Sequence, residues 1–161
     1  MSVSESGHGV RALLPGEACG PVLKLTEALN AWGGLDPDTG VIVHHSHPQR
    51  GRSLAGHVLV MPESRGSGTN AQVFAQAWAT GHGPLAVVLA APDYVLCVGA
   101  VVSRELYGVH CPVVVAGETV YGAITDGDVL EVTATESAGA LKLSPAPGVP
   151  TGGSALRPRF R

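Results

Sequence analysis

The chain has 161 residues, and 10 Lys and Arg against 13 Asp and Glu give a formal net charge of −3. This length fits a single domain, and a mildly acidic chain offers no electrostatic basis for binding nucleic acid. The 22 Gly and 12 Pro stand beside a hydrophobic share of 45%, which indicates a turn-rich folded chain and excludes disorder throughout. Charged residues make up only 14%, so we expect a partner to cover part of the surface.

Short apolar runs between Gly and Pro residues predict β-strands through the middle of the chain. Most of them have about five residues, as in a compact sheet or barrel. They are residues 10–14, 22–25, 41–44, 57–61, 85–90, 112–116 and 129–133. Two stretches, 125–128 and 137–139, have the composition of turns that close short strands.

Two segments have the spacing of helices. In 71–80, four apolar residues fall on one face and Gly81 follows as a C-terminal cap. In 93–106, a similar face is rich in Val, and Gly108 follows it. A few helices beside many short strands predict a mixed α/β domain.

The two ends have a different composition from the middle. Residues 1–9 and 145–161 are dense in Ser, Gly and Pro, which predicts flexible tails around a domain at 10–144. The first residues lack the basic and then apolar order of a signal peptide. The apolar stretches are well short of the roughly 18 residues that a membrane span needs. We therefore expect a cytoplasmic protein that does not contact a membrane.

The three cysteines, Cys19, Cys97 and Cys111, lie far apart and form no metal-binding spacing. This pattern predicts buried, reduced thiols.

The segment 61–70 joins a predicted strand to the first predicted helix and combines Gly with small hydroxyl residues. Free amides at a helix N-terminus can hold a carboxylate or phosphate, with Arg65 as a bidentate clamp. Ser67 or Thr69 can equally be an ordinary N-cap, and the sequence leaves both interpretations open.

Three other patterns carry weaker functional signals. Asp36 and Asp38 lie in a Gly-rich loop that lacks the ligand spacing of a calcium loop, so turn-forming carboxylates are favoured. His45 and His47 have the spacing of two metal ligands, but no third ligand can be identified, so a polar cluster bordering a loop is favoured. The stretch around Ser67 resembles a nucleophile elbow but lacks its first Gly, and there is no nucleotide-binding motif.

The order of motifs along the chain resembles the small, swivelling subunit of the aconitase X family over residues 14–133. The match rests on Trp32-Gly33-Gly34, His47-Pro48, Ser53-Leu54-Ala55-Gly56, Arg65-Gly66-Ser67, Gly83-Pro84-Leu85-Ala86 and Cys111-Pro112-Val113-Val114. The resemblance implies a swivelling β/β/α domain, in which a small barrel-like sheet is flanked by helices. Such a domain docks over a larger subunit that holds an iron or iron–sulfur centre, so no metal ligand or cofactor is expected in this chain.

The resemblance also implies a reaction and a set of site residues. The family dehydrates hydroxy acids, and its Arg-Gly-Ser serine, here Ser67, acts as the catalytic base. We expect the substrate to be cis-3-hydroxy-L-proline, because the charge-poor composition is neither halophilic nor hyperthermophilic. The partner expected is the aconitase X large subunit, in a heterodimer. The substrate-binding residues predicted are Arg65, Gly66, Gly68, Thr69, Asp36 and His47.

The chain departs from the family pattern beside the serine, where Ser64 replaces a glycine and Asn70 interrupts a run of hydroxyl residues. Three alternatives therefore stay open. The chain can be the small subunit of a phosphomevalonate dehydratase, a swivel or binding paralogue without catalysis, or a phosphohistidine-carrying module of similar architecture. The last requires an exposed His at a helix N-terminus, where the sequence places none.

Overall fold

A computed structural model describes residues 9–144 and 146, so nearly all of the predicted tails at 1–9 and 145–161 lies outside the described residues. The larger sheet contains seven strands, with β1 and β9 at its two edges. The strands in sheet order are β1 (Val10–Leu14), β7 (Val113–Ala116), β6 (Ala86–Leu89), β5 (Val58–Met61), β2 (Gly16–Lys24), β8 (Val129–Ala134) and β9 (Gly139–Ser144). A short antiparallel pair, β3 (Leu35–Asp36) and β4 (Val41–Ile42), lies apart from it.

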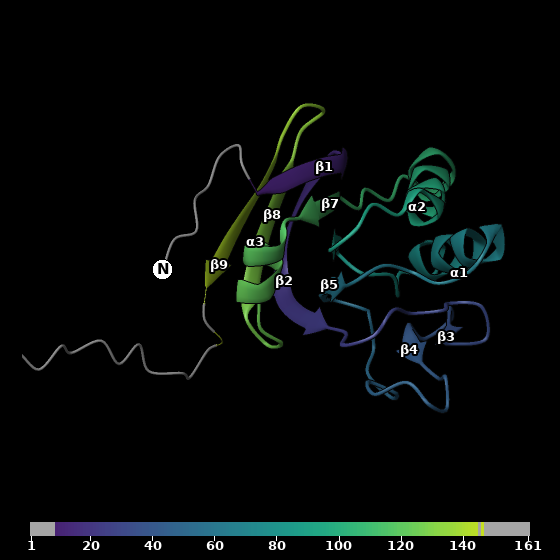
Figure 1. Cartoon of the computed structure of the whole chain (residues 1–161). Helices are drawn as coiled ribbons and strands as arrows, with labels where there is room; N and C mark the ends of the chain where they lie inside the picture. The colour runs from purple at the N-terminus through teal and green to yellow at the C-terminus, as the bar shows by residue number, and fades with distance from the viewer. Residues whose placement is uncertain (1–8, 145, 147–161) are drawn as a thin grey trace, which may run out of the picture.

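The seven-stranded sheet curls until its edges approach. Strands β2, β5, β6 and β7 are parallel neighbours, while β1, β8 and β9 pair antiparallel. A Cβ at Gly139 of β9 would lie 2.8 Å from the Val10 side chain of β1, so the two edges touch. Figure 1 shows β8 and β9 on one side and helices α1 (Gly68–Ala79) and α2 (Tyr94–Tyr107) on the other. The predicted barrel-like sheet flanked by helices is confirmed.

The parallel strands are buried on both faces, which is why they are almost wholly apolar. Successive side chains of a strand point to opposite faces. In β5, Leu59 and Met61 pack toward α1 and α2, while Val58 and Val60 fill the barrel with residues of β6, β7 and β8. The short helix α3 (Glu118–Ala123) borders the barrel interior, where Val120 packs against the same cluster.

Helices α1 and α2 pack closely because small residues face each other. A Cβ at Gly99 of α2 would lie only 2.6 Å from the Ala71 carbonyl oxygen of α1, so the contact requires glycine. Ser103 Oγ donates to the carbonyl oxygen of Gly99 at 2.9 Å and is thereby satisfied while buried. This contact sets the position of the α1 N-terminus relative to that of α2.

The predicted elements agree with the structure in type, with several corrections to their ends. Helix α1 begins three residues before the predicted 71, and α2 is displaced by one residue from 93–106. Strand β2 extends back to Gly16, through a Gly- and Pro-containing stretch that hides its pattern, and β4 is shorter than 41–44. The elements β3, α3 and β9 were missed, because each is short or mixes Gly with isolated apolar residues. No helix in the described part of the chain is long and apolar enough to cross a membrane.

The prediction of buried thiols holds for two of the three cysteines. Cys97 and Cys111 are buried and free, whereas Cys19 lies exposed on β2, so the prediction was wrong there. Burial, with a smaller contribution from the negative charge of Asp93, raises the pKa of Cys97 to about 11. Burial also raises the pKa of Cys111.

We expect one thiol to react rapidly with a disulfide reagent at pH 8 and three to react in denaturant. At that pH only about one Cys97 side chain in a thousand is thiolate, because the raised pKa lies about three units higher. Counting the chromophore released by the native chain tests this, and Cys19→Ser should remove the rapid reaction. Rapid reaction of all three thiols in the native chain would contradict the burial of Cys97 and Cys111.

Candidate functional site

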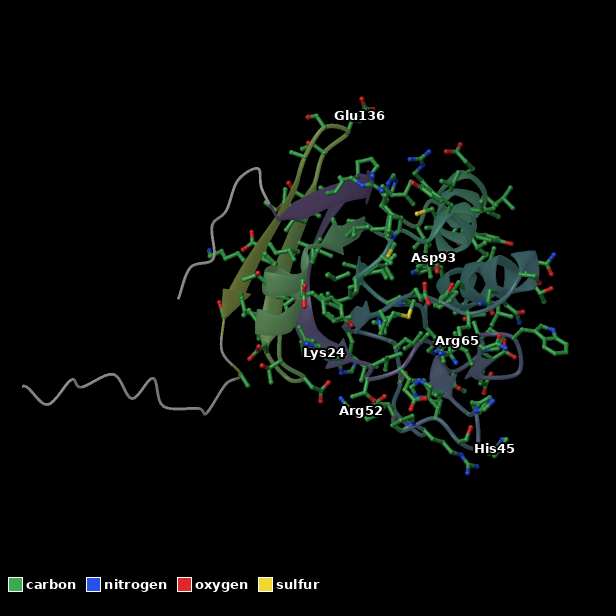
Figure 2. All side chains as sticks on the ribbon, in the orientation of Figure 1. Lys24, His45, Arg52, Arg65, Asp93 and Glu136 are labelled. Atoms are coloured by element: carbon green, nitrogen blue, oxygen red, sulfur yellow. The ribbon has the colours of Figure 1, made fainter. Side chains whose placement is uncertain are left out.

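The candidate site lies where β5 ends and α1 begins, at the carboxyl ends of the parallel strands. Strand β5 leads through residues 62–67 into α1, and β6 leads into α2 in the same way. Both helix N-termini therefore lie at one edge of the sheet, where ligands commonly bind in sheets of this type. Figure 2 shows Arg65 and Asp93 on the side of α1 and α2, and Glu136 at the tip of the β8–β9 hairpin.

Ser67 is the N-cap of α1. Its backbone is extended, its side chain is exposed, and its Oγ accepts the Thr69 backbone N–H at 3.5 Å. A cap bond of that length is long for a protein hydrogen bond, so the oxygen is only weakly engaged. The capping interpretation is thus confirmed for Ser67, and the same oxygen remains open to a ligand beside the amides of the first helical turn.

Arg65 precedes Ser67 by two residues and is exposed. Its backbone N–H donates to the Leu29 carbonyl at 2.9 Å, which holds the loop against the chain that leads toward Trp32. Among the described residues, no carboxylate pairs with the Arg65 guanidinium. The guanidinium can therefore bind an anion that approaches Ser67.

Asn70 anchors this loop from beneath. Its side chain is fully buried, its Oδ1 accepts the Trp32 backbone N–H at 3.0 Å, and its Nδ2 donates to the Arg65 carbonyl. Gly66 has φ +128° and approaches so closely that a Cβ there would lie 2.9 Å from Asn70 Nδ2. Only glycine combines that backbone angle with that space. One amide side chain thus ties together the Trp32 loop and the Arg-Gly-Ser turn.

Asp93 provides a second anchor. It is buried at the N-cap of α2, where its Oδ1 accepts the Leu96 backbone N–H at 3.0 Å. Its Oδ2 accepts the backbone N–H of Ser64 at 2.9 Å and also the Ser64 hydroxyl. Charge-assisted hydrogen bonds of this kind are stronger than neutral ones. The carboxylate therefore joins the start of α2 to the loop that carries Ser67.

An open hollow lies directly beside Ser67. Asn30, Trp32, Gly66, Ser67 and Thr69 line it, and the Trp32 side chain is 65% exposed at its rim. Of the predicted site residues, Arg65, Gly66, Gly68 and Thr69 thus lie in or next to the turn that holds Ser67. A small anionic molecule in this hollow would meet a hydroxyl, free helix amides and an aromatic ring.

Asp36 does not lie beside Ser67. Its carboxylate accepts bonds from the Thr39 hydroxyl and the Asp38 backbone N–H, and these bonds lower its pKa. The loop that holds Asp36 contacts the other end of α1, where the Thr80 hydroxyl donates to the Pro37 carbonyl at 2.7 Å. The 12 residues of α1, at about 1.5 Å of rise each, put roughly 18 Å between the helix ends. The turn interpretation therefore accounts for Asp36, and its predicted contact with substrate is not supported.

His47 is about nine-tenths buried and does not line the hollow. Its Nδ1 accepts the Gln49 backbone N–H at 3.1 Å, and its Nε2 has no partner among the described residues. The rings of His44 and His45 stack on each other, with centroids 4.9 Å apart. Within the described residues, no group of three or more His, Cys, Asp or Glu side chains could hold a metal ion, so the half-site at His45 and His47 is not completed there.

Sequence reasoning missed the two anchors of the loop. Asp93 has a recognisable signal, because an Asp at the start of a predicted helix is a typical N-cap. Asn70 was noted only as a departure from a motif, and nothing in the sequence indicates that its side chain spans two loops. Its bonds join residues 32 and 65, which lie far apart in the chain.

The structure is thus a mixed α/β domain, in which a nearly closed sheet is flanked by helices and a serine lies at the N-terminus of α1. The family model described as aconitase X swivel domain matches residues 8–142. The chain belongs to this family.

Relatives of known function include two kinds of dehydratase. The cis-3-hydroxy-L-proline dehydratase of Pseudomonas aeruginosa is 38% identical over 108 residues, which are 67% of this chain and 19% of that protein. The chain thus spans about a fifth of the length of that relative. The phosphomevalonate dehydratase small subunit of Methanosarcina acetivorans is 31% identical over 127 residues, which cover 78% of this chain and 84% of that subunit.

A solved structure shares the fold. The crystal structure of holo aconitase X from Thermococcus kodakaraensis superposes with a TM-score of 0.71 and 25% sequence identity. The superposition covers 84% of this chain and 98% of the matched chain. The family resemblance and the barrel-like fold expected from the motif order are both confirmed.

Proposed function

We propose that this chain is the small subunit of an aconitase X-type hydro-lyase, and that Ser67 acts as the catalytic base at a site shared with a larger subunit. The substrate favoured is cis-3-hydroxy-L-proline. The observation that carries the proposal is the placement of Ser67: an exposed serine with a long cap bond, at a helix N-terminus, beside an open hollow.

The reaction can be written in terms of this chain's own groups. Ser67 Oγ, as an alkoxide, takes the proton from the carbon next to the substrate carboxylate. The electron pair of that C–H bond forms the new C=C bond, and the hydroxyl on the neighbouring carbon leaves with the electrons of its C–O bond. The Arg65 guanidinium is free to bind the carboxylate as a bidentate clamp. The α1 amides stabilise the negative charge on Ser67 before the proton arrives.

The energetics require a partner. A helix N-terminus stabilises an anion by roughly 0.3–1 kcal/mol at an exposed position and about 2 kcal/mol when partly buried. One pKa unit corresponds to about 1.4 kcal/mol, so the helix lowers the pKa of a serine hydroxyl by only about one unit. The remaining stabilisation must come from Arg65 and from a site closed to water, where charges interact more strongly. The exposed loop of the isolated chain does not provide such a site.

The larger subunit would close this site and carry the metal. The relative named as a small subunit implies a larger companion, and the P. aeruginosa relative has four-fifths of its length outside the matched domain. An iron or iron–sulfur centre in that companion would supply a Lewis acid for the leaving hydroxyl. We further infer a heterodimer that works in the cytoplasm, a location supported by the free thiols of Cys97 and Cys111.

A second candidate substrate is phosphomevalonate. It is favoured by the match to an archaeal small subunit over most of that subunit's length. Both substrates are hydroxy acids, so the same serine, arginine and helix amides would serve either one.

We expect the chain, co-purified with the large subunit from the same genome, to dehydrate one of these two substrates, whereas either subunit alone shows no turnover. The measurement is product formation from cis-3-hydroxy-L-proline and from phosphomevalonate, under anaerobic conditions that preserve a metal centre. Turnover of only phosphomevalonate would overturn the favoured substrate. A stable complex that dehydrates neither compound would favour another of the alternatives, a swivel or binding paralogue without catalysis.

A further inference from the structure

Exposed apolar side chains gather on one helix of this domain. Among the described residues, eight large hydrophobic side chains are exposed, and five of them lie on α2. Four follow the spacing i, i+4, i+8 and i+12, which places them along one side of the helix. We call these four residues the α2 stripe: Tyr94, Val98, Val102 and Leu106, with Val98 56% exposed and Leu106 68% exposed.

The α2 stripe carries little charge. The charged residues of α2 are Arg104 and Glu105, near its C-terminal end, and they bond to each other with Nη2 to Oε1 at 2.9 Å. The rest of the exposed side is aliphatic or aromatic. Soluble monomers rarely expose a continuous apolar surface of this kind, and such surfaces usually mark interaction sites.

A groove between α1 and α2 extends the same surface. Its α2 wall includes Val98, Val102 and Tyr107, and its α1 wall consists of small and amide residues. The small residues of the α1 wall and Gly99 leave the groove open, so side chains of a second protein can enter it. The groove therefore suits a surface with protruding apolar side chains.

The groove reaches the candidate site. Gly68 lines its end, and the preceding residue, Ser67, lines the hollow on the other side of the α1 N-terminus. The exposed Trp32 stands at the rim of that hollow. A protein that closes the hollow over Ser67 therefore arrives directly beside the α2 stripe.

We propose that the α2 stripe and the α1–α2 groove form the docking surface for the larger aconitase X subunit. This inference rests on the proposed function, since the occupant is the subunit that completes the site at Ser67. The occupant is a large chain that presents an apolar ridge and, next to it, the remainder of the active site. In the cis-3-hydroxy-L-proline dehydratase relative, the polypeptide outside the matched domain is about four times as long as that domain. It is long enough to supply an occupant of this kind.

The test measures binding of the full chain to the large subunit from the same genome. We expect Val98→Asp and Leu106→Asp each to raise the Kd at least tenfold, because each buries an unpaired carboxylate in an apolar contact. Leu85→Asp is the matched control: Leu85 is 37% exposed and lies beside Trp78 and Gly81, at the other end of α1. We expect its Kd to stay within threefold of wild type. Circular dichroism melts establish that each variant is folded.

A second measurement uses the wild-type chain, so its result does not depend on whether the variants fold. In hydroxyl-radical footprinting of the wild-type chain, Tyr94 and Leu106 should be protected on addition of the large subunit, and Leu85 should not. Unchanged Kd values in both stripe variants, or equal oxidation of the stripe in the free and bound chain, would overturn the docking surface. A dimer of this chain that protects the stripe and persists with the large subunit present would also overturn it, in favour of a second copy as occupant.

The outcomes separate this inference from the proposed function. A complex that assembles through the stripe but dehydrates neither substrate leaves the docking surface intact and contradicts the proposed activity. An active complex in which the stripe variants leave the Kd unchanged contradicts only the docking surface. A wild-type chain that does not bind the large subunit contradicts both.

Discussion

Ser67→Ala is expected to lower kcat of the assembled enzyme by at least about a thousandfold, while the complex forms with wild-type affinity. The reason is that the variant removes the oxygen that we propose takes the proton and leaves Arg65 and the helix amides in place. Steady-state turnover of the purified complex, together with its elution volume, measures both quantities. Full activity in this variant would eliminate Ser67 as the base.

The same variant separates catalysis from capping. Loss of an ordinary serine cap costs about 0.5–2 kcal/mol of stability, and the 3.5 Å bond of Ser67 predicts a value at the low end. If Ser67 were only a cap, the free energy of unfolding would fall by such an amount with turnover retained. Ser137→Ala in the exposed β8–β9 loop is the matched control, and it should change neither quantity.

Asn70→Ala is expected to destabilise the isolated chain by about 2–4 kcal/mol, because it leaves the Trp32 N–H and the Arg65 carbonyl without their partner at a buried position. Chemical denaturation of the full chain measures this change. In the complex, at a temperature where the variant is folded, we expect kcat to fall roughly ten- to a hundredfold, since small displacements of a catalytic group are costly.

Gln72→Ala is the control for the stability measurement, because Gln72 is an exposed residue of the same helix. It should change the free energy of unfolding by less than about 0.5 kcal/mol. Acrylamide quenching of Trp32 fluorescence, read in a Trp78→Phe background, should increase in the Asn70 variant as the Trp32 loop loosens. Wild-type kcat in a destabilised Asn70→Ala chain would show that this residue supports the fold and does not position the Arg-Gly-Ser turn.

The regular elements could be predicted largely from local pattern. The apolar runs of β5, β6 and β7 and the helical spacing of α1 and α2 are visible in the sequence, because parallel strands buried on both faces are continuously apolar and helices repeat every 3.6 residues. The Arg-Gly-Ser turn before α1 was found for the same reason: it joins two elements that are adjacent in the chain. Strand β9 was missed because it mixes Gly139 with isolated apolar residues, and helix α3 because its six residues are too few to show a helical period.

Composition also led to an expectation about the surface. The low share of charged residues predicts a face covered by a partner, and we propose the α2 stripe as that face because its large apolar side chains are exposed. The apolar residues of α2 that are buried and those that are exposed look alike in sequence. Which of them faces α1 and which faces outward depends on how the two helices pack, and Gly99 against Ala71 sets that packing.

The sequence by itself determined the family and the strand-to-helix turn with its serine, because both depend on local residue order, and its composition led to the expectation of a partner. Only the tertiary structure decided which residues lie together at the candidate site. It put Asp36 at the far end of α1, kept His47 out of the hollow, and brought Asn70 and Asp93 under the loop. Hydrogen bonds between loops far apart in the chain arise from packing, and no local pattern encodes them.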